Sequence, residues 1–243
     1  MSTQETELLY QIDSYLREFE AEVVDIVDNG IVLNKTAFLP RSGGLVNDIG
    51  YIVVNDKQLN ILNVYIDKEK NVVVHVVEDL IEDVRVGSTV KGVINWDRRY
   101  KLMRLHTAAH MISAIMYRDY NALITGGNIE PDYAYDDYGL EVFDKKIFED
   151  AIAKANEIVK QGLGVKIYWL KRDEALKIPG IVKLAERMPP EVNMLRVVEI
   201  PGIDIQADGG PHVRNTKEIG EIVFIKAENK GKKRKRLYYT VKP

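Results

Sequence analysis

Hydrophobic residues in the first 95 positions gather in short runs, and polar turn residues separate one run from the next. The runs are rich in β-branched and aromatic side chains, which favour strands, and an Asn-Gly pair at positions 29 and 30 favours a hairpin. Several short strands at such close spacing predict a small β-barrel or β-sandwich. The expected strands cover Phe19–Ile26, Ile31–Leu33, Tyr51–Val54, Leu59–Tyr65, Val72–Val77 and Val90–Asn95.

The pattern changes at Trp96, where hydrophobic residues begin to recur at a helical spacing. Residues Trp96–Tyr117 contain neither proline nor glycine, and apolar side chains share one side of the predicted helix. A second amphipathic helix is predicted over Asp144–Gln161, with Asp144 as its N-cap and Gly162 at its end. The other expected elements are a broken helical segment over Asp173–Arg187 and strands over Tyr138–Phe143, Val165–Leu170, Leu195–Ile200, Glu221–Lys226 and Leu237–Val241.

Together these elements predict an α+β protein with two domains. Residues 1–92 are expected to form a small β-barrel domain that carries a glycine-rich loop between Pro40 and Gly50. Residues 93–243 are expected to form an α+β domain in which helices pack against an antiparallel sheet.

Composition and charge narrow the functional classes. The 243 residues are 46% hydrophobic and 29% charged, which favours a packed core over disorder. The net charge is −3, so any nucleic-acid binding must rest on local basic patches. No apolar run approaches the ~20 residues that span a bilayer, and the polar N-terminus is unlike a secretory signal. We therefore expect no membrane anchor and a cytoplasmic location.

Several catalytic classes lack their signatures in this sequence. The absence of cysteine excludes disulfides, cysteine-based metal sites and thiol nucleophiles. The chain also has no Gly-x-Ser-x-Gly elbow, no phosphate-binding loop and no dinucleotide fingerprint, so no nucleotide cofactor is expected. Attack by water, assisted by a metal ion, is the simplest chemistry that the sequence supports.

Three of the four histidines fall in two arrangements that suit a metal ion. His106 and His110 are four residues apart on the predicted helix, which places both rings on one face. Asp208 and His212 flank a Gly-Gly-Pro turn that lets their side chains converge. Each feature alone favours an ordinary helix surface or turn, but together they predict a site of three nitrogens and one oxygen, either structural or catalytic. His75, in an apolar run, is expected to be an ordinary strand residue that packs or faces solvent, and not a metal ligand.

Two basic clusters indicate a polyanionic partner, because phosphate contacts need local positive charge. One cluster opens the histidine helix, where Arg99 shares a direction with His106, and the other lies near the C-terminus. The alternatives are an exposed helical turn for the first cluster and a solvated hairpin tip for the second. The residues are Arg98, Arg99, Lys101 and Arg104 in the helix, and Lys230, Lys232, Lys233, Arg234, Lys235 and Arg236 near the C-terminus.

Five segments, taken in chain order, resemble the motifs of one known family. The chain is similar to the AlaX family, the free-standing relatives of the editing domain of alanyl-tRNA synthetase, over nearly its whole length and in the order of the medium-length, two-domain members. The segments are Thr36–Gly44 with the trailing Asp48-Ile49-Gly50, Met103–His110, Thr125–Gly127, Ile203–Val213 and Asn229–Gly231.

The resemblance implies a barrel like those of translation factors, followed by an α+β editing core. It implies hydrolysis of the ester that wrongly joins serine or glycine to tRNA(Ala), with tRNA(Ala) as the partner of the basic clusters. It also implies a zinc ion held by His106, His110, Asp208 and His212. Thr125 falls where the family contacts the amino-acid side chain, and Gly43 and Gly44 fall in a loop that is associated with editing.

Four positions depart from the pattern of the AlaX family. Asp208 replaces a cysteine, so the ion would have a harder set of ligands, and Pro211 replaces a threonine near the site. In the glycine loop, Leu45 replaces a glutamine and Ser42 replaces the first glycine. These departures bear on the range of substrates and on the geometry of the loop more than on the class of reaction.

Zinc-dependent deacylation of mischarged tRNA(Ala) is therefore the leading prediction. Arg99, Arg104 and Lys232–Arg236 are the residues expected to contact the tRNA. Two alternatives stay open: a non-catalytic tRNA-binding module with a structural metal, and a metal-dependent hydrolase of another small ester or amide. The sequence does not predict an oligomeric state.

Overall fold

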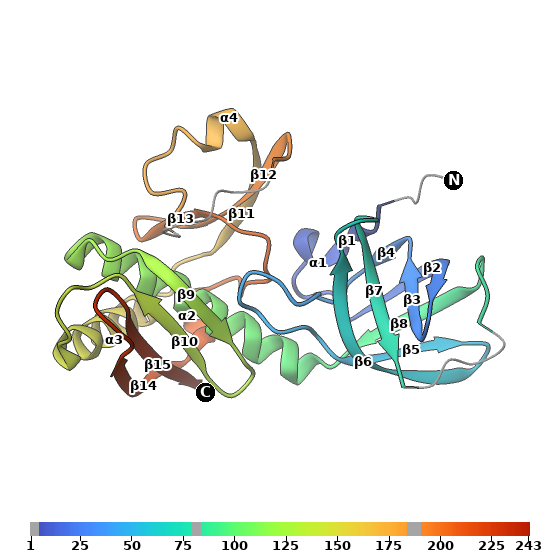
Figure 1. Ribbon diagram of the computed structural model, residues 1–243, viewed down its shortest axis with the longest axis horizontal. Coiled ribbons are helices and arrows are strands. Elements are labelled where there is room, and N and C mark those ends of the chain that lie inside the picture. The colour runs from blue at the N-terminus through green and yellow to red at the C-terminus, as the bar shows by residue number, and fades with distance from the viewer. Residues whose placement is uncertain (1–4, 79–83, 184–190) are drawn as a thin grey trace. The chain divides into compact units, whose positions relative to one another are not determined.

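The structure is a computed structural model that describes residues 5–78, 84–183 and 191–243 (Figure 1). Strands and helices combine in the predicted α+β architecture. The chain divides into two compact units, Met1–Tyr100 and Lys101–Pro243. The boundary expected between residues 92 and 93 lies before helix α2 (Trp96–Tyr120), whereas the units divide near the start of that helix.

The first unit contains a closed barrel of six antiparallel strands, which confirms the predicted barrel. Exposed and buried side chains alternate along its strands, as from Glu18 to Val23, so that one set fills the interior. Around the barrel, the strands follow the order β2 (Glu18–Val27), β3 (Gly30–Leu33), β7 (Val72–Val77), β6 (Lys57–Asp67), β5 (Gly50–Val54) and β8 (Thr89–Ile94). The short elements nearby are β1 (Glu7–Leu8), α1 (Leu9–Ile12) and β4 (Lys35–Thr36), of which β1 and β4 pair in parallel.

His75 lies in barrel strand β7, as predicted, and of the two expected environments the structure shows the buried one. Its Nε2 lies 2.8 Å from Thr36 Oγ1, and its Nδ1 lies 3.0 Å from the carbonyl oxygen of Ile31. Burial lowers the pKa of this imidazole to about 4, so the ring is neutral at physiological pH.

Helix α2 is buried on all sides through its middle, because every side chain from residue 102 to residue 116 is buried. The amphipathic stripe seen in the sequence therefore understates how deeply the helix is packed. Polar residues on this stretch, His106, Thr107, His110 and Ser113, must consequently find partners within the protein. This is the element that brings two of the predicted metal ligands into the interior.

The second unit builds two antiparallel sheets. The larger has the order β14-β15-β10-β9, and helix α3 packs against β14. The smaller has the order β11-β12-β13 and carries the glycine turn after its last strand. The elements are β9 (Ile124–Ile129), β10 (Ala134–Tyr138), α3 (Lys145–Gln161), β11 (Lys166–Lys171), α4 (Arg172–Ala175), β12 (Met194–Ile200), β13 (Asp204–Ala207), the 3₁₀ helix η1 (Thr216–Ile219), β14 (Glu221–Asn229) and β15 (Lys235–Lys242).

The predicted caps of α3 are confirmed, whereas one strand is misplaced. The Asp144 carboxylate accepts a hydrogen bond from the backbone N–H of Lys146, and Gly162 ends the helix at φ 68°. The strand expected over Tyr138–Phe143 is wrong, because β10 ends at Tyr138 and the apolar Val142 beyond it is exposed. Of the expected segment 173–187, the structure forms only the short helix α4, and residues 184–187 lie outside the described residues.

Candidate metal centre

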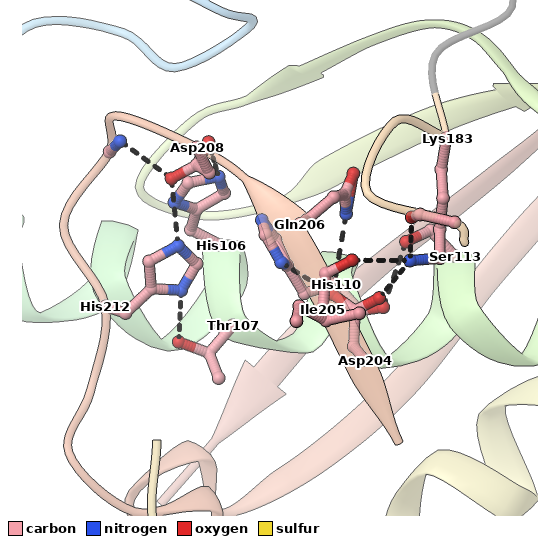
Figure 2. Close-up of polar contacts among 12 residues, drawn as sticks. His106, Thr107, His110, Ser113, Lys183, Asp204, Ile205, Gln206, Asp208 and His212 are labelled. Carbon is pink, nitrogen blue, oxygen red and sulfur yellow. Dashed lines mark hydrogen bonds and ion pairs between the residues drawn. The ribbon is translucent and has the colours of Figure 1, made fainter. Parts of the chain in front are cut away.

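The four residues predicted to bind a metal ion come together in the second unit (Figure 2). His106 and His110 project from neighbouring turns of α2, and Asp208 and His212 come from the turn that follows β13. One ligand atom from each residue lies within 4.8 Å of the others. The ring centroid of His212 is 4.1 Å from that of His106 and 4.6 Å from that of His110.

The glycine turn is shaped by contacts at its own backbone. The Asp208 carboxylate accepts a hydrogen bond of 2.7 Å from the N–H of Gly210, and Arg196 Nη1 donates to the carbonyl oxygens of Asp208 and Gly210 at 2.9 Å. A Cβ atom at Gly210 would lie 2.5 Å from Cε1 of His106, so only glycine allows the turn this close to the ring. The turn thus holds its carboxylate and the helix imidazole at the same point.

Each of the three imidazoles is held through its Nδ1 atom. His106 Nδ1 donates to the carbonyl oxygen of Pro211 at 3.3 Å, and His110 Nδ1 donates to Asp204 Oδ2 at 2.9 Å. The Thr107 hydroxyl donates to a carbonyl in its own helix, so its oxygen accepts from His212 Nδ1 at 3.0 Å. Because every Nδ1 carries the proton, the three Nε2 atoms are left as metal ligands.

The charges at the site also suit a bound cation. Burial lowers the pKa of His106 to about 4 and that of His212 well below its usual value, so both rings are neutral. Burial works to raise the pKa of Asp208, but the neighbouring imidazoles of His106 and His212 outweigh it and hold the pKa well below its usual value, so the group is a carboxylate. The Asp208 carboxylate therefore faces the lone pairs of two neutral imidazoles, with Oδ2 3.1 Å from His212 Nε2. A divalent cation between these groups turns a repulsion into an attraction.

Burial opposes the charged form of His110 too, but the hydrogen bond and the charge of Asp204 overcome it and raise the pKa of this ring. His110 is thus the one imidazole of the cluster whose Nδ1 partner carries a formal negative charge. Sequence reasoning did not single out Asp204, Thr107 or Arg196 as parts of the site. The available signal was clear only for Arg196, which lies between the buried apolar residues Leu195 and Val197, whereas Thr107 follows a histidine and Asp204 lies between two half-buried isoleucines.

The three predicted catalytic-site residues lie outside this four-ligand cluster. Thr125 is an exposed residue of β9, and its hydroxyl donates to the carbonyl oxygen of Asp137 at 3.2 Å. Gly43 and Gly44 belong to the first unit, where they form a tight turn with φ angles of 59° and 89° that favour glycine.

Arg99 and Arg104 are both buried and do not reach the surface. The Arg99 guanidinium forms a double ion pair with Asp48 and donates to backbone carbonyls, including that of Ala37 at 2.6 Å. Arg104 donates to the carbonyl oxygens of Ile219 and Lys242 at 2.6 Å each. These arginines hold distant segments together, so we leave both out of any surface for a polyanion.

The basic run near the C-terminus divides into buried and exposed parts. Lys235 is buried, and its ammonium donates to the carbonyl oxygens of Gly231 and Lys232 within the β14–β15 turn. Arg236 pairs with Asp137 at 2.7 and 2.9 Å and stacks over a tyrosine ring. Of the residues expected to contact the tRNA, Lys232, Lys233 and Arg234 are exposed at the tip of the hairpin, where Lys230 is exposed as well and pairs with Glu228.

Comparison with known proteins places the chain in a family. Residues 195–238 match the family described as the threonyl and alanyl tRNA synthetase second additional domain, and residues 3–98 match the tRNA synthetases class II (A). The chain is 55% identical to the alanyl-tRNA editing protein AlaX-M of Saccharolobus solfataricus. The alignment runs over 239 residues and covers 98% of this chain and all of the relative. The chain belongs to the AlaX-M family.

Other AlaX-M proteins match at similar coverage. The AlaX-M protein of Methanosarcina barkeri is 38% identical over 240 residues, which is 97% of this chain and 99% of the relative. The alanine–tRNA ligase of Saccharolobus islandicus is 33% identical over 232 residues, which is 93% of this chain but only 25% of the ligase. The segment matched at residues 195–238 holds Asp208 and His212 of the AlaX-M site, whereas His106 and His110 lie between the two matched segments.

A membrane-spanning helix is not found in the described part of the chain, since none of its helices is both long and apolar enough.

Proposed function

We propose that this protein is a zinc-dependent hydrolase that removes serine, and glycine as a second substrate, from mischarged tRNA(Ala). The observation that carries the proposal is the convergence of His106, His110, Asp208 and His212 in a chain of the AlaX-M family. Three imidazole nitrogens and one carboxylate oxygen form a ligand set that zinc accepts at about 2.0–2.2 Å. The carboxylate takes the place of a thiolate, which this cysteine-free chain cannot supply.

The ester between an amino acid and a tRNA is already activated, so its hydrolysis needs no covalent nucleophile. A bound divalent cation supplies positive charge that polarises an ester carbonyl or a water molecule. The chain supplies the geometry: Pro211, Asp204 and Thr107 fix the three imidazoles, and the turn at Gly210 fixes the carboxylate. A site held this firmly loses little free energy to reorganisation during the reaction.

We place the amino-acid side chain of the substrate beside Thr125. The hydroxyl of Thr125 uses its proton on the carbonyl of Asp137, so its oxygen is left to accept a hydrogen bond from the hydroxyl of a seryl group. A site that hydrogen-bonds a substrate hydroxyl rejects the analogue without it far better than an apolar pocket does. This contact would favour the seryl ester over the alanyl ester, and the removal of glycine would not depend on it.

The glycine loop is proposed to contribute to editing as a firmly anchored element. Asp48 accepts the N–H of Leu39 at 2.7 Å and pairs with Arg99, which ties the two ends of the loop to each other and to the first turn of α2. Gly43 and Gly44 form the tip of this loop. The tRNA itself is proposed to contact the exposed cations at the tip of the β14–β15 hairpin, namely Lys232, Lys233 and Arg234.

One assay tests the function: the release of serine from Ser-tRNA(Ala), measured with the protein as purified, after a strong chelator, and after zinc is added back. We expect release that the chelator abolishes and zinc restores, and no release from His212→Ala. Ala-tRNA(Ala) is the control substrate and should stay intact. Binding of tRNA without turnover would instead favour a non-catalytic module with a structural metal. Absence of both would favour a hydrolase of another small ester or amide.

A further inference from the structure

Asp204 and Lys183 form a buried ion pair directly behind the predicted metal ligand His110 (Figure 2). The side chain of Asp204 is 0% exposed and that of Lys183 is 7% exposed. Asp204 is the first residue of β13, and Lys183 lies in the segment that precedes residues 184–190. For an ion pair buried this deeply, the free energy lost by removing both charges from water exceeds the free energy gained from their attraction, unless further hydrogen bonds satisfy both groups.

Every remaining hydrogen bond of the pair is made. Besides Asp204, the Lys183 ammonium donates to the carbonyl oxygens of Gly180 at 2.9 Å and Ile205 at 3.1 Å. Asp204 uses Oδ1 for Lys183 and Oδ2 for His110 Nδ1 at 2.9 Å, and Gln206 Nε2 also donates to Oδ2 at 3.5 Å. The two carboxylate oxygens thus have separate tasks, one toward the lysine and one toward the histidine.

The other two histidines of the cluster are held differently. His106 donates to the backbone carbonyl of Pro211, and His212 donates to the hydroxyl of Thr107, both of which are neutral acceptors. A carboxylate on Nδ1 increases the electron density at Nε2 and makes the imidazole a stronger ligand. Of the three Nδ1 acceptors in the cluster, only Asp204 is charged, and it supports a single ligand, His110. Lys183 compensates the charge of this acceptor.

We propose that Asp204 is a positioning residue that fixes the ring of His110 and strengthens Nε2 as a metal ligand. Lys183 holds the other carboxylate oxygen, which keeps Asp204 turned toward the ring and prevents it from becoming a metal ligand itself. The proposal rests on the proposed metal site and adds two residues that support it. It predicts that the charge of Asp204 contributes to the affinity for the metal, beyond any contribution to folding.

The first test compares zinc affinity, measured by competition with a chromogenic chelator, in the full-length protein and in Asp204→Asn. The asparagine keeps an oxygen for His110 but loses the charge, and we expect the affinity to fall about 10–100-fold. The visible spectrum of the Co²⁺-loaded variant should also change, because it reports the geometry around the ion. Asp132→Asn is the matched control, since that carboxylate is 84% exposed, and it should bind zinc as the unmodified protein does.

A double variant separates positioning from a purely structural role. Asp204→Asn alone leaves the buried Lys183 ammonium uncompensated, which lowers the melting temperature of the metal-free protein. Adding Lys183→Met removes that charge, so we expect the melting temperature to recover while the zinc affinity stays low. Recovery of both quantities, or unchanged zinc affinity in Asp204→Asn, would overturn the proposal. Failure of the unmodified protein to bind zinc would instead reject the metal site itself.

Discussion

At the scale of single residues, Asp136 is a carboxyl group whose surroundings oppose its charge. It is a buried residue of β10, and Tyr239 donates a hydrogen bond of 2.8 Å to its Oδ2. Burial and the neighbouring charge of Asp137 outweigh this hydrogen bond and raise the pKa of Asp136 to about 7. In the folded protein this group therefore keeps its proton well above the pH at which an aspartate normally loses it.

This pKa makes the stability of the protein depend on pH. Between pH 4 and pH 7 the unfolded chain releases the proton of Asp136 while the folded chain retains it, so the free energy of unfolding falls as pH rises. The loss amounts to about 4 kcal/mol at most and is complete above pH 7. We expect Asp136→Asn to flatten the pH dependence in this range, measured by denaturant unfolding at pH 5 and pH 8. The control Asp132→Asn should keep the slope of the unmodified protein, and an equal slope in Asp136→Asn would contradict the assignment.

At the scale of elements, the β14–β15 hairpin separates cations that hold the fold from cations that face solvent. Lys235 and Arg236 lie at the start of β15 and are occupied by backbone carbonyls and by Asp137. The three cations before them are exposed in the turn, where Lys233 pairs with Glu141 at the surface and Arg234 lies 3.9 Å from the Asp137 carboxylate. Six of the seven positions from 230 to 236 are basic and look alike in the sequence, and only the register of the hairpin tells them apart.

We expect the combined variant Lys232→Gln, Lys233→Gln, Arg234→Gln to bind tRNA more weakly at low salt. Each removed phosphate contact should also reduce the slope of log affinity against log salt by about one. Filter binding of tRNA at several salt concentrations measures both effects. The matched control changes three exposed lysines elsewhere in the second unit, Lys166, Lys171 and Lys177, to glutamine, which removes the same charge. If the salt slope of the hairpin variant equals that of the control variant and of the unmodified protein, the tip of the hairpin is an ordinary solvated turn and does not contact the tRNA.

At the scale of the whole molecule, the parts that could be predicted from the sequence are those encoded locally. The barrel follows from β-branched runs, the caps of α3 follow from Asp144 and Gly162, and the four clustered groups follow from residue types at suitable spacing. The roles of Arg99 and Arg104 could not be predicted, because their partners lie 51 and up to 138 residues away in the chain. The partners of the metal ligands are hidden for the same reason, since Asp204 is 94 residues from His110.

Because the four groups come from α2 and from a turn about 100 residues later, a metal ion bound by all of them links distant parts of the second unit. An ion that binds only the folded protein stabilises it by about 4 kcal/mol when its free concentration is 1,000 times the dissociation constant. A chelator should therefore lower the melting temperature by about 2–4 °C for each kcal/mol lost. Hydrogen exchange should rise near His106 and His212, whereas β7, which carries the buried His75 of the barrel, serves as the internal control. The melting temperature of His212→Ala should be lower than that of the unmodified protein, and the chelator should change it little. If the chelator shifts His212→Ala as much as the unmodified protein, the stabilising ion lies somewhere other than this cluster.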